Sequence, residues 1–163
     1  VNSAGINIRS NLSATEEAET NLVLETNLIA PMFLTKGLLR FLQKSESARV
    51  INLASIFATI SYAGRSNYSV SKGGLLQLTK TLAAEFAQSE ITVNSISPGP
   101  FLTEINKKVL DDPENYKDFC RNIPMGRFGD PQEIVTAALF LASPYSSYVT
   151  GSNVLVDGGW TAT

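Results

Sequence analysis

Residues 49–96 read RVINLASIFATISYAGRSNYSVSKGGLLQLTKTLAAEFAQSEITVNSI, and this stretch predicts the fold. It begins with a short apolar run, Arg49 to Ala54, whose length suits a buried strand. Apolar residues at helical spacing follow between Ser66 and Gln88. Ile91 to Ile96 is again short and rich in β-branched residues, as strands prefer. A strand, a long helix and another strand in succession are typical of a parallel sheet covered by helices.

The segments on either side continue this alternation. Asn21 to Leu42 has apolar residues at helical spacing, and Asp130 to Ala142 begins with an N-cap aspartate followed by proline. Asn153 to Val156 predicts a last strand, which the turn residues Asp157-Gly158-Gly159 close. We therefore expect an α/β fold, a parallel sheet with helices on both faces, formed by residues 1–163 as a single domain.

Composition limits the classes of function. Hydrophobic residues make up 44% of the chain and charged residues 17%, which predicts a packed core. A net charge of −2 gives no bulk attraction to nucleic acid, and we expect no apolar run long enough to span a bilayer. The absence of histidine excludes Ser-His-Asp triads and disfavours zinc sites. The single cysteine, Cys120, favours a reducing compartment such as the cytoplasm.

Tyr68 and Lys72 carry the sharpest chemical signal. They are four positions apart within a predicted helix, so they share one face about one turn apart. An ammonium beside a phenol favours the phenolate and lowers the pKa of the tyrosine. Tyr68 would then serve as a general acid and base near neutral pH. Taken alone, the spacing is common on helices and favours a solvated lysine beside a half-buried tyrosine; the residues around it give it weight.

Further small and polar residues follow the predicted strands. Ser55 comes directly after Arg49 to Ala54, and Pro98 to Thr103 follows the predicted strand Ile91 to Ile96. Asn2 to Gly5 is expected to end an earlier strand. Because ligands of open parallel sheets bind at the carboxyl ends of the strands, these segments are expected to meet at one edge. Asn27 lies inside an apolar helix, where a buried amide needs partners.

In this order, the residues resemble the short-chain dehydrogenase/reductase family in its form with a single Rossmann-like domain, and the resemblance covers essentially the whole chain. It implies that Tyr68 is the catalytic acid and base, and that Ser55 holds the substrate oxygen. Lys72 would lower the pKa of Tyr68 and bind the nicotinamide ribose. Asn27 would position a water in a proton relay to Lys72. The implied cofactor is NAD or NADP, which carries the hydride without a metal.

The resemblance also implies contacts with the cofactor. One segment, expected beside the adenosine ribose, departs from the family's Asn-Asn-Ala-Gly at its second position and comprises Asn2, Ser3, Ala4 and Gly5. The loop expected on the nicotinamide comprises Pro98, Gly99, Phe101 and Thr103. Structural alternatives stay open: Asn27 as a buried amide bonded to the backbone, Ser55 as a turn serine, and the Pro-Gly and Asp-Gly-Gly segments as turns only.

The family's glycine-rich opening, Thr-Gly-x-x-x-Gly-x-Gly, has no counterpart in this sequence. That opening binds the pyrophosphate, and the units that carry it would add on the order of 60–90 residues. We therefore expect the chain to be the C-terminal portion of a longer enzyme and to bind dinucleotide poorly by itself. The alternative is a non-catalytic assembly module of this length.

The sequence indicates the substrate less specifically than it indicates the family. Residues 124–133 read PMGRFGDPQE, which resembles family members that act on sugar acids and polyols, and also 3-oxoacyl carrier-protein reductases. We expect a small polar alcohol or ketone such as gluconate, with a carrier-protein thioester as the alternative.

Assembly is expected from the two long helices. Asn21 to Leu42 and Ser66 to Gln88 are apolar on more than one side, so one side of each is left for a partner. The family pairs these helices across a two-fold axis and makes a second contact with the helix after Pro131 and the last strand. A homodimer or homotetramer follows as the expectation.

Overall fold

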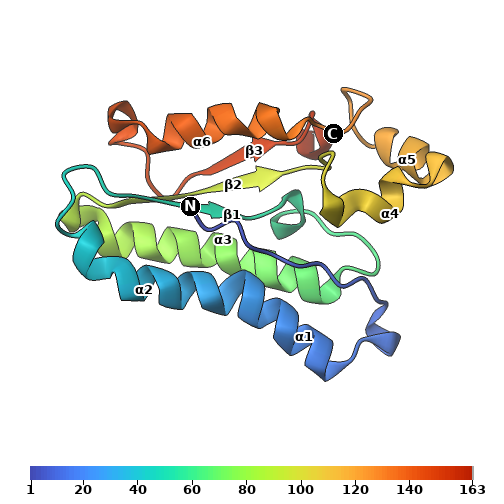
Figure 1. Ribbon diagram of the computed structural model, residues 1–163, viewed down its shortest axis with the longest axis horizontal. Helices are drawn as coiled ribbons and strands as arrows, with labels where there is room; N and C mark the ends of the chain where they lie inside the picture. The colour runs from blue at the N-terminus through green and yellow to red at the C-terminus, as the bar shows by residue number, and fades with distance from the viewer. Residues whose placement is uncertain (163) are drawn as a thin grey trace.

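The computed structural model describes residues 1–162. Its centre is a sheet of three parallel strands in the order β1-β2-β3 (Figure 1). The strands are β1 (Arg49–Leu53), β2 (Thr92–Pro98) and β3 (Asn153–Val156). The middle strand, β2, is buried from Thr92 to Ser97, as expected for a strand covered on both faces.

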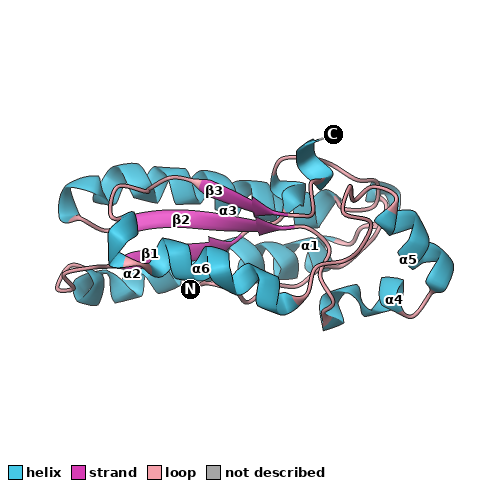
Figure 2. Cartoon of the chain, turned by 90° about the horizontal axis from the view of Figure 1, so that it is seen from above, coloured by secondary structure: helices cyan, strands magenta, loops and turns pink. Residues whose placement is uncertain are grey.

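Helices cover both faces of this sheet (Figures 1 and 2). One face carries the three helices α1 (Glu17–Leu24), α2 (Ala30–Leu42) and α3 (Ser66–Phe86). The other face carries α6 (Val135–Ala142). The predicted α/β class, a parallel sheet with helices on both faces, is confirmed.

The first predicted helix is longer than expected and is interrupted. Helical backbone runs from Glu17 to Leu42, and the segment Glu25–Ile29 forms a π-helical turn between α1 and α2. Asn27 lies in this turn and is fully buried. Apolar periodicity does not reveal a π turn, which widens the helix locally and often occurs at functional sites.

This same helix corrects one expectation. Glu17–Leu42 is 26 residues long and is apolar enough, by length and composition, to cross a membrane, contrary to the sequence expectation. The helix instead packs against α3 as part of the layer that covers the sheet (Figure 1). Its buried Asn27 is hydrogen-bonded to Ile6 and to Ser71, which ties the helix to the N-terminal segment and to α3.

The helix after Pro131 begins as predicted. The Asp130 side chain accepts a hydrogen bond from the Gln132 amide at 2.8 Å, and the Glu133 side chain accepts one from the Asp130 amide at 2.7 Å. This capping box satisfies amides that the first turn leaves free. The first turn, Pro131–Ile134, is a 3-10 helix, and α6 follows it directly.

Two short helices lie at the carboxyl end of the sheet. They are α4 (Lys107–Leu110) and α5 (Pro113–Cys120), in the segment whose sequence is polar and weakly periodic (Figure 1). They help enclose an apolar cluster that includes Ile56, Phe57, Tyr68 and Trp160. The carboxyl ends of the strands therefore lie next to a cluster of apolar and aromatic side chains.

Candidate active site

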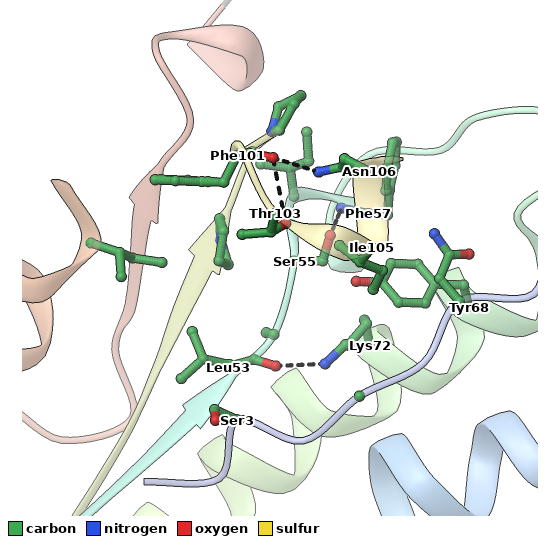
Figure 3. Close-up of a pocket in the computed structure, with 18 of the residues that line it drawn as sticks. Ser3, Leu53, Ser55, Phe57, Tyr68, Lys72, Phe101, Thr103, Ile105 and Asn106 are labelled. Carbon is green, nitrogen blue, oxygen red and sulfur yellow. Dashed lines mark hydrogen bonds between the residues drawn. The ribbon is translucent and has the colours of Figure 1, made fainter. Parts of the chain in front are cut away.

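A cavity of about 240 Å³ lies where β1 and β2 end, beside α3 (Figure 3). Its lining includes most of the residues that the sequence predicted for the site, although they come from distant segments. These residues are Ser3, Gly5, Ser55, Tyr68, Lys72, Pro98, Gly99, Phe101 and Thr103. Asn2, Ala4 and Asn27 do not line it.

The N-terminal segment approaches this cavity along the edge of β1. Asn2 forms one parallel bridge with Asn52 instead of a strand, with amide and carbonyl hydrogen bonds to Ile51 and Leu53 at 2.8 and 2.9 Å. Its side chain donates to Asn52 Oδ1 at 2.7 Å. Asn2 thus holds the segment in place, and Ser3 and Gly5 follow at the cavity.

Asn27 lies behind the cavity. Its side chain accepts from the Ile6 amide at 2.9 Å and donates to the Ile6 carbonyl at 2.9 Å and to Ser71 Oγ at 3.0 Å. These bonds match the alternative of a buried amide bonded to the backbone. A Cβ at Gly5 would lie 3.3 Å from Asn27 Oδ1 and 3.4 Å from Lys72 Nζ, so Asn27 and Lys72 flank the same glycine.

Ser55 lies just past the end of β1 and is buried. Its Oγ accepts a hydrogen bond from the Phe57 amide at 3.2 Å and thereby caps the 3-10 turn Ile56–Ala58. A hydroxyl that accepts one bond still has its own hydrogen to donate. Ser55 is therefore a turn serine, as one alternative held, that also presents a donor to the cavity.

Tyr68 points from α3 into the cavity, towards Ser55 and Ile105 (Figure 3). Burial raises the pKa of Tyr68, while a hydrogen bond with Ser55 and the charge of Arg65 act in the opposite direction. The net direction differs from the lowering that the Tyr68 and Lys72 spacing predicted. The reason is that Tyr68 is only 9% exposed, and desolvation disfavours the phenolate.

Lys72 is 4% exposed, which rules out the solvated lysine considered above. Its Nζ donates to the Leu53 carbonyl at 2.6 Å, and lies 5.9 Å from the centroid of the Tyr68 ring (Figure 3). Burial lowers the pKa of Lys72 to about 8. Tyr68 and Lys72 share one face of α3 as predicted, but the ammonium is bonded to β1.

The loop after β2 closes another wall of the cavity. Gly99 donates its amide to the Val156 carbonyl at 2.9 Å, which ties the loop to β3. Asn106 Nδ2 donates to the Phe101 carbonyl at 3.0 Å and holds the other end (Figure 3). A Cβ at Gly99 would lie 2.8 Å from the Asp157 Cα, so glycine permits this close approach.

Replacing Gly99 with alanine should therefore destabilise the chain, because backbone atoms cannot move aside as a side-chain end does. Overpacking of this kind costs about 1–3 kcal/mol in the free energy of unfolding. Gly37→Ala is the matched control, since nothing lies within 4 Å of a Cβ there and alanine favours the helix. Urea denaturation of both variants measures the difference. Equal stability of the two variants would contradict the close packing at Gly99.

Phe57 and Arg65 also line the cavity, although the sequence did not predict them there. Phe57 makes edge contacts with the rings of Tyr68 and Trp160, with centroids 6.4 and 6.3 Å apart. Arg65 lies 5.2 Å above the Phe57 ring and is 4% exposed. The signal for Arg65 was its place at the start of a long helix, where the helix dipole disfavours a cation.

The family model for enoyl-(acyl carrier protein) reductase matches residues 1–161. The chain belongs to the short-chain dehydrogenase family. The predicted resemblance is therefore confirmed, and it covers the strands, the helices and the cavity described above.

Its relatives act on more than one kind of substrate, by their names. The chain is 39% identical over 159 residues to the 3-oxoacyl-[acyl-carrier-protein] reductase of Vibrio cholerae, with 98% of this chain and 64% of the relative covered. It is also 39% identical over 163 residues to the galactitol 2-dehydrogenase (L-tagatose-forming) of Cereibacter sphaeroides, with 99% and 64% covered.

The chain is also similar to a solved dehydrogenase structure. A gluconate 5-dehydrogenase from Burkholderia cenocepacia, in complex with NADP and tartrate, superposes with a TM-score of 0.96 at 32% identity. The match covers 99% of this chain and 64% of that protein. The chain thus spans 64% of the length of the curated relatives that it matches first.

Proposed function

We propose that this chain is the catalytic portion of a nicotinamide-dependent dehydrogenase that interconverts a small hydroxy compound and its ketone. The observation that carries the proposal is the shared cavity, in which Ser55, Tyr68 and Lys72 meet at the carboxyl end of the sheet. We further infer that an N-terminal unit with the glycine-rich cofactor site precedes residue 1 in a longer protein, called the full-length enzyme below.

The residues at the cavity fit NAD or NADP. An ammonium has three donors, and Lys72 uses one on Leu53; within residues 1–162, no other hydrogen bond holds it. The free donors suit the hydroxyls of a ribose. We assign Ser3 and Gly5, with their neighbours Asn2 and Ala4, to the ribose side of the cofactor. The nicotinamide side would be held by Pro98, Gly99, Phe101 and Thr103.

The bound cofactor would supply the hydride, and the chain would supply the proton and the geometry. Ser55 and Tyr68 both donate towards the substrate oxygen, which gains negative charge as a ketone is reduced. The raised pKa of Tyr68 keeps the phenol protonated at neutral pH, as a proton donor requires. In the oxidative direction, Tyr68 accepts the proton, and the Lys72 ammonium favours the phenolate that this requires. Asn27, held beside Gly5, would position a water that leads to Lys72.

Two substrate classes are supported by the similar proteins. The gluconate and galactitol dehydrogenases favour a sugar acid or polyol, which is our first choice. The 3-oxoacyl carrier-protein reductases favour a thioester as the second. Assays of the full-length enzyme with NAD and NADP, against gluconate, galactitol and acetoacetyl thioesters, separate them. No turnover of any of these substrates with either cofactor would contradict the proposal.

Assembly into a homodimer or homotetramer is the expected state of this chain. Large apolar side chains are exposed on α2, namely Phe33, Leu34, Leu38 and Phe41, and on α6, namely Val135, Leu139 and Phe140. Exposed apolar faces of this kind are removed from water when a partner subunit packs against them. Light scattering at several concentrations should give a dimer or larger. A soluble monomer at micromolar concentration would contradict the expectation.

A further inference from the structure

Arg65 is a buried cation in the cavity wall, and no residue within 1–162 supplies it with a counter-ion. Its side chain is 4% exposed and lines the same cavity as Tyr68. The ion pairs among the described residues join other side chains, and in the same part of the chain no carboxylate is hydrogen-bonded to the Arg65 guanidinium. Burial lowers the pKa of Arg65 to about 10, so the guanidinium keeps its charge at neutral pH.

The surroundings of Arg65 add to the cost of this charge. Arg65 is the N-cap residue of α3, a helix of 21 residues, and the amino end of a helix repels cations. The positive charge of Arg9 lies close enough to lower the pKa of Arg65 further. The Phe57 ring, 5.2 Å from the guanidinium, offsets only part of the desolvation. The amino end of α3 and the charge of Arg9 would instead favour an anion bound beside Arg65.

The position of Arg65 relative to Tyr68 and Lys72 indicates which anion would bind. Arg65, Tyr68 and Lys72 are spaced by three and four positions, so they follow one another along one side of α3. Tyr68 is therefore flanked by Arg65 one turn before it and by Lys72 one turn after it. Lys72 lies beside Leu53 and Gly5. Arg65 lies on the other side of Tyr68, so it would contact the far end of a substrate whose reacting oxygen is bound at Tyr68.

We propose that Arg65 binds a carboxylate of the substrate and thereby sets specificity for small hydroxy or oxo acids over their uncharged analogues. This proposal rests on the proposed function, because it places the reacting oxygen at Tyr68. Guanidinium and carboxylate form paired, charge-assisted hydrogen bonds, which fix orientation as well as charge. The reacting carbon of such a substrate lies within a few bonds of the carboxylate, since one helical turn separates Arg65 from Tyr68.

The test compares D-gluconate with D-gluconamide, which differ only at the carboxylate, in the full-length enzyme and its Arg65→Gln variant. The KM for gluconate should rise by about 10- to 100-fold, as expected for loss of a charge-assisted pair, with little change in kcat. The KM for gluconamide should stay nearly constant. Arg40→Gln is the matched control, because Arg40 also lies over a phenylalanine ring, that of Phe41, but is exposed.

The results distinguish a failure of the carboxylate site at Arg65 from a failure of the proposed oxidoreductase function. Equal changes for both substrates, or none for either, would overturn the role of Arg65 while oxidoreductase activity itself stands. Turnover confined to galactitol or to acetoacetyl thioesters would do the same. If the Gln variant unfolds, Arg65→Lys keeps the charge and should retain a preference for gluconate; a loss of that preference in a folded Lys variant counts against the carboxylate site. If no substrate is turned over, calorimetry must still show gluconate binding more tightly than gluconamide, and equal binding overturns the proposal.

Discussion

Replacing Tyr68 with phenylalanine in the full-length enzyme should lower kcat by about 10²- to 10⁴-fold, the range for loss of a general acid or base. The substitution removes the hydroxyl and keeps the ring, so the edge contact with Phe57 and the packing at the cavity should survive. The dissociation constant for NAD or NADP should change little. Steady-state kinetics and a fluorescence titration of the cofactor measure the two quantities.

Tyr145→Phe is the control for this variant, because Tyr145 is fully solvent-exposed and lies outside the cavity. It should behave like the unmodified enzyme. If the Tyr68 variant kept most of its kcat, another group would have to move the proton, and the assignment of Tyr68 would be wrong. A folded variant that no longer binds cofactor would also count against the assignment.

Replacing Lys72 with methionine should impair both cofactor binding and turnover. Methionine fills a similar volume but removes the donors and the charge that we assign to the ribose and to the Tyr68 phenolate. Loss of hydrogen bonds to a charged group predicts a weakening of cofactor binding by about 10- to 150-fold. The same titration and kinetics measure it. A variant that binds cofactor normally would contradict the ribose contact.

The lowered pKa of Lys72 gives this role a signature in pH. Burial lowers that pKa from its usual value of 10.5 to about 8, so the ammonium is present below pH 8 and is lost as the pH rises through it. The reductive rate of the unmodified enzyme should therefore fall above about pH 8. Lys72→Arg, which stays charged, should retain more of its rate there. Identical profiles for the two would contradict a requirement for the ammonium.

Much of the fold follows from periodicity. The strand–helix–strand order of residues 49–96 predicts β1, α3 and β2 because each element has the length and apolar spacing of its class. The π turn around Asn27 and the 3-10 turn after Pro131 were not predictable in the same way. The π turn contains Asn27, whose side chain is hydrogen-bonded to Ile6, a residue far away in the sequence, and the 3-10 turn contains the capping box.

The candidate site was predictable in membership but not in its electrostatics. Residues at the ends of parallel strands meet because the topology requires it, and Ser55, Tyr68 and Lys72 do so. The direction of the Tyr68 pKa was predicted wrongly, because spacing along a helix carries no information about desolvation. Arg65 was missed for the same reason, since only the packed structure shows that this cation is buried.

Transfer of a labelled hydride shows whether the cavity around Tyr68 is an oxidoreductase site. The full-length enzyme is incubated with reduced nicotinamide cofactor (NADH or NADPH) that carries deuterium at both C4 positions, and with 5-keto-gluconate or an acetoacetyl thioester. We predict that the alcohol product carries one deuterium at the former carbonyl carbon, and that Tyr68→Phe abolishes nearly all of this transfer. Products without the label, or transfer that persists unchanged in the Phe variant, would contradict an oxidoreductase site built around Tyr68.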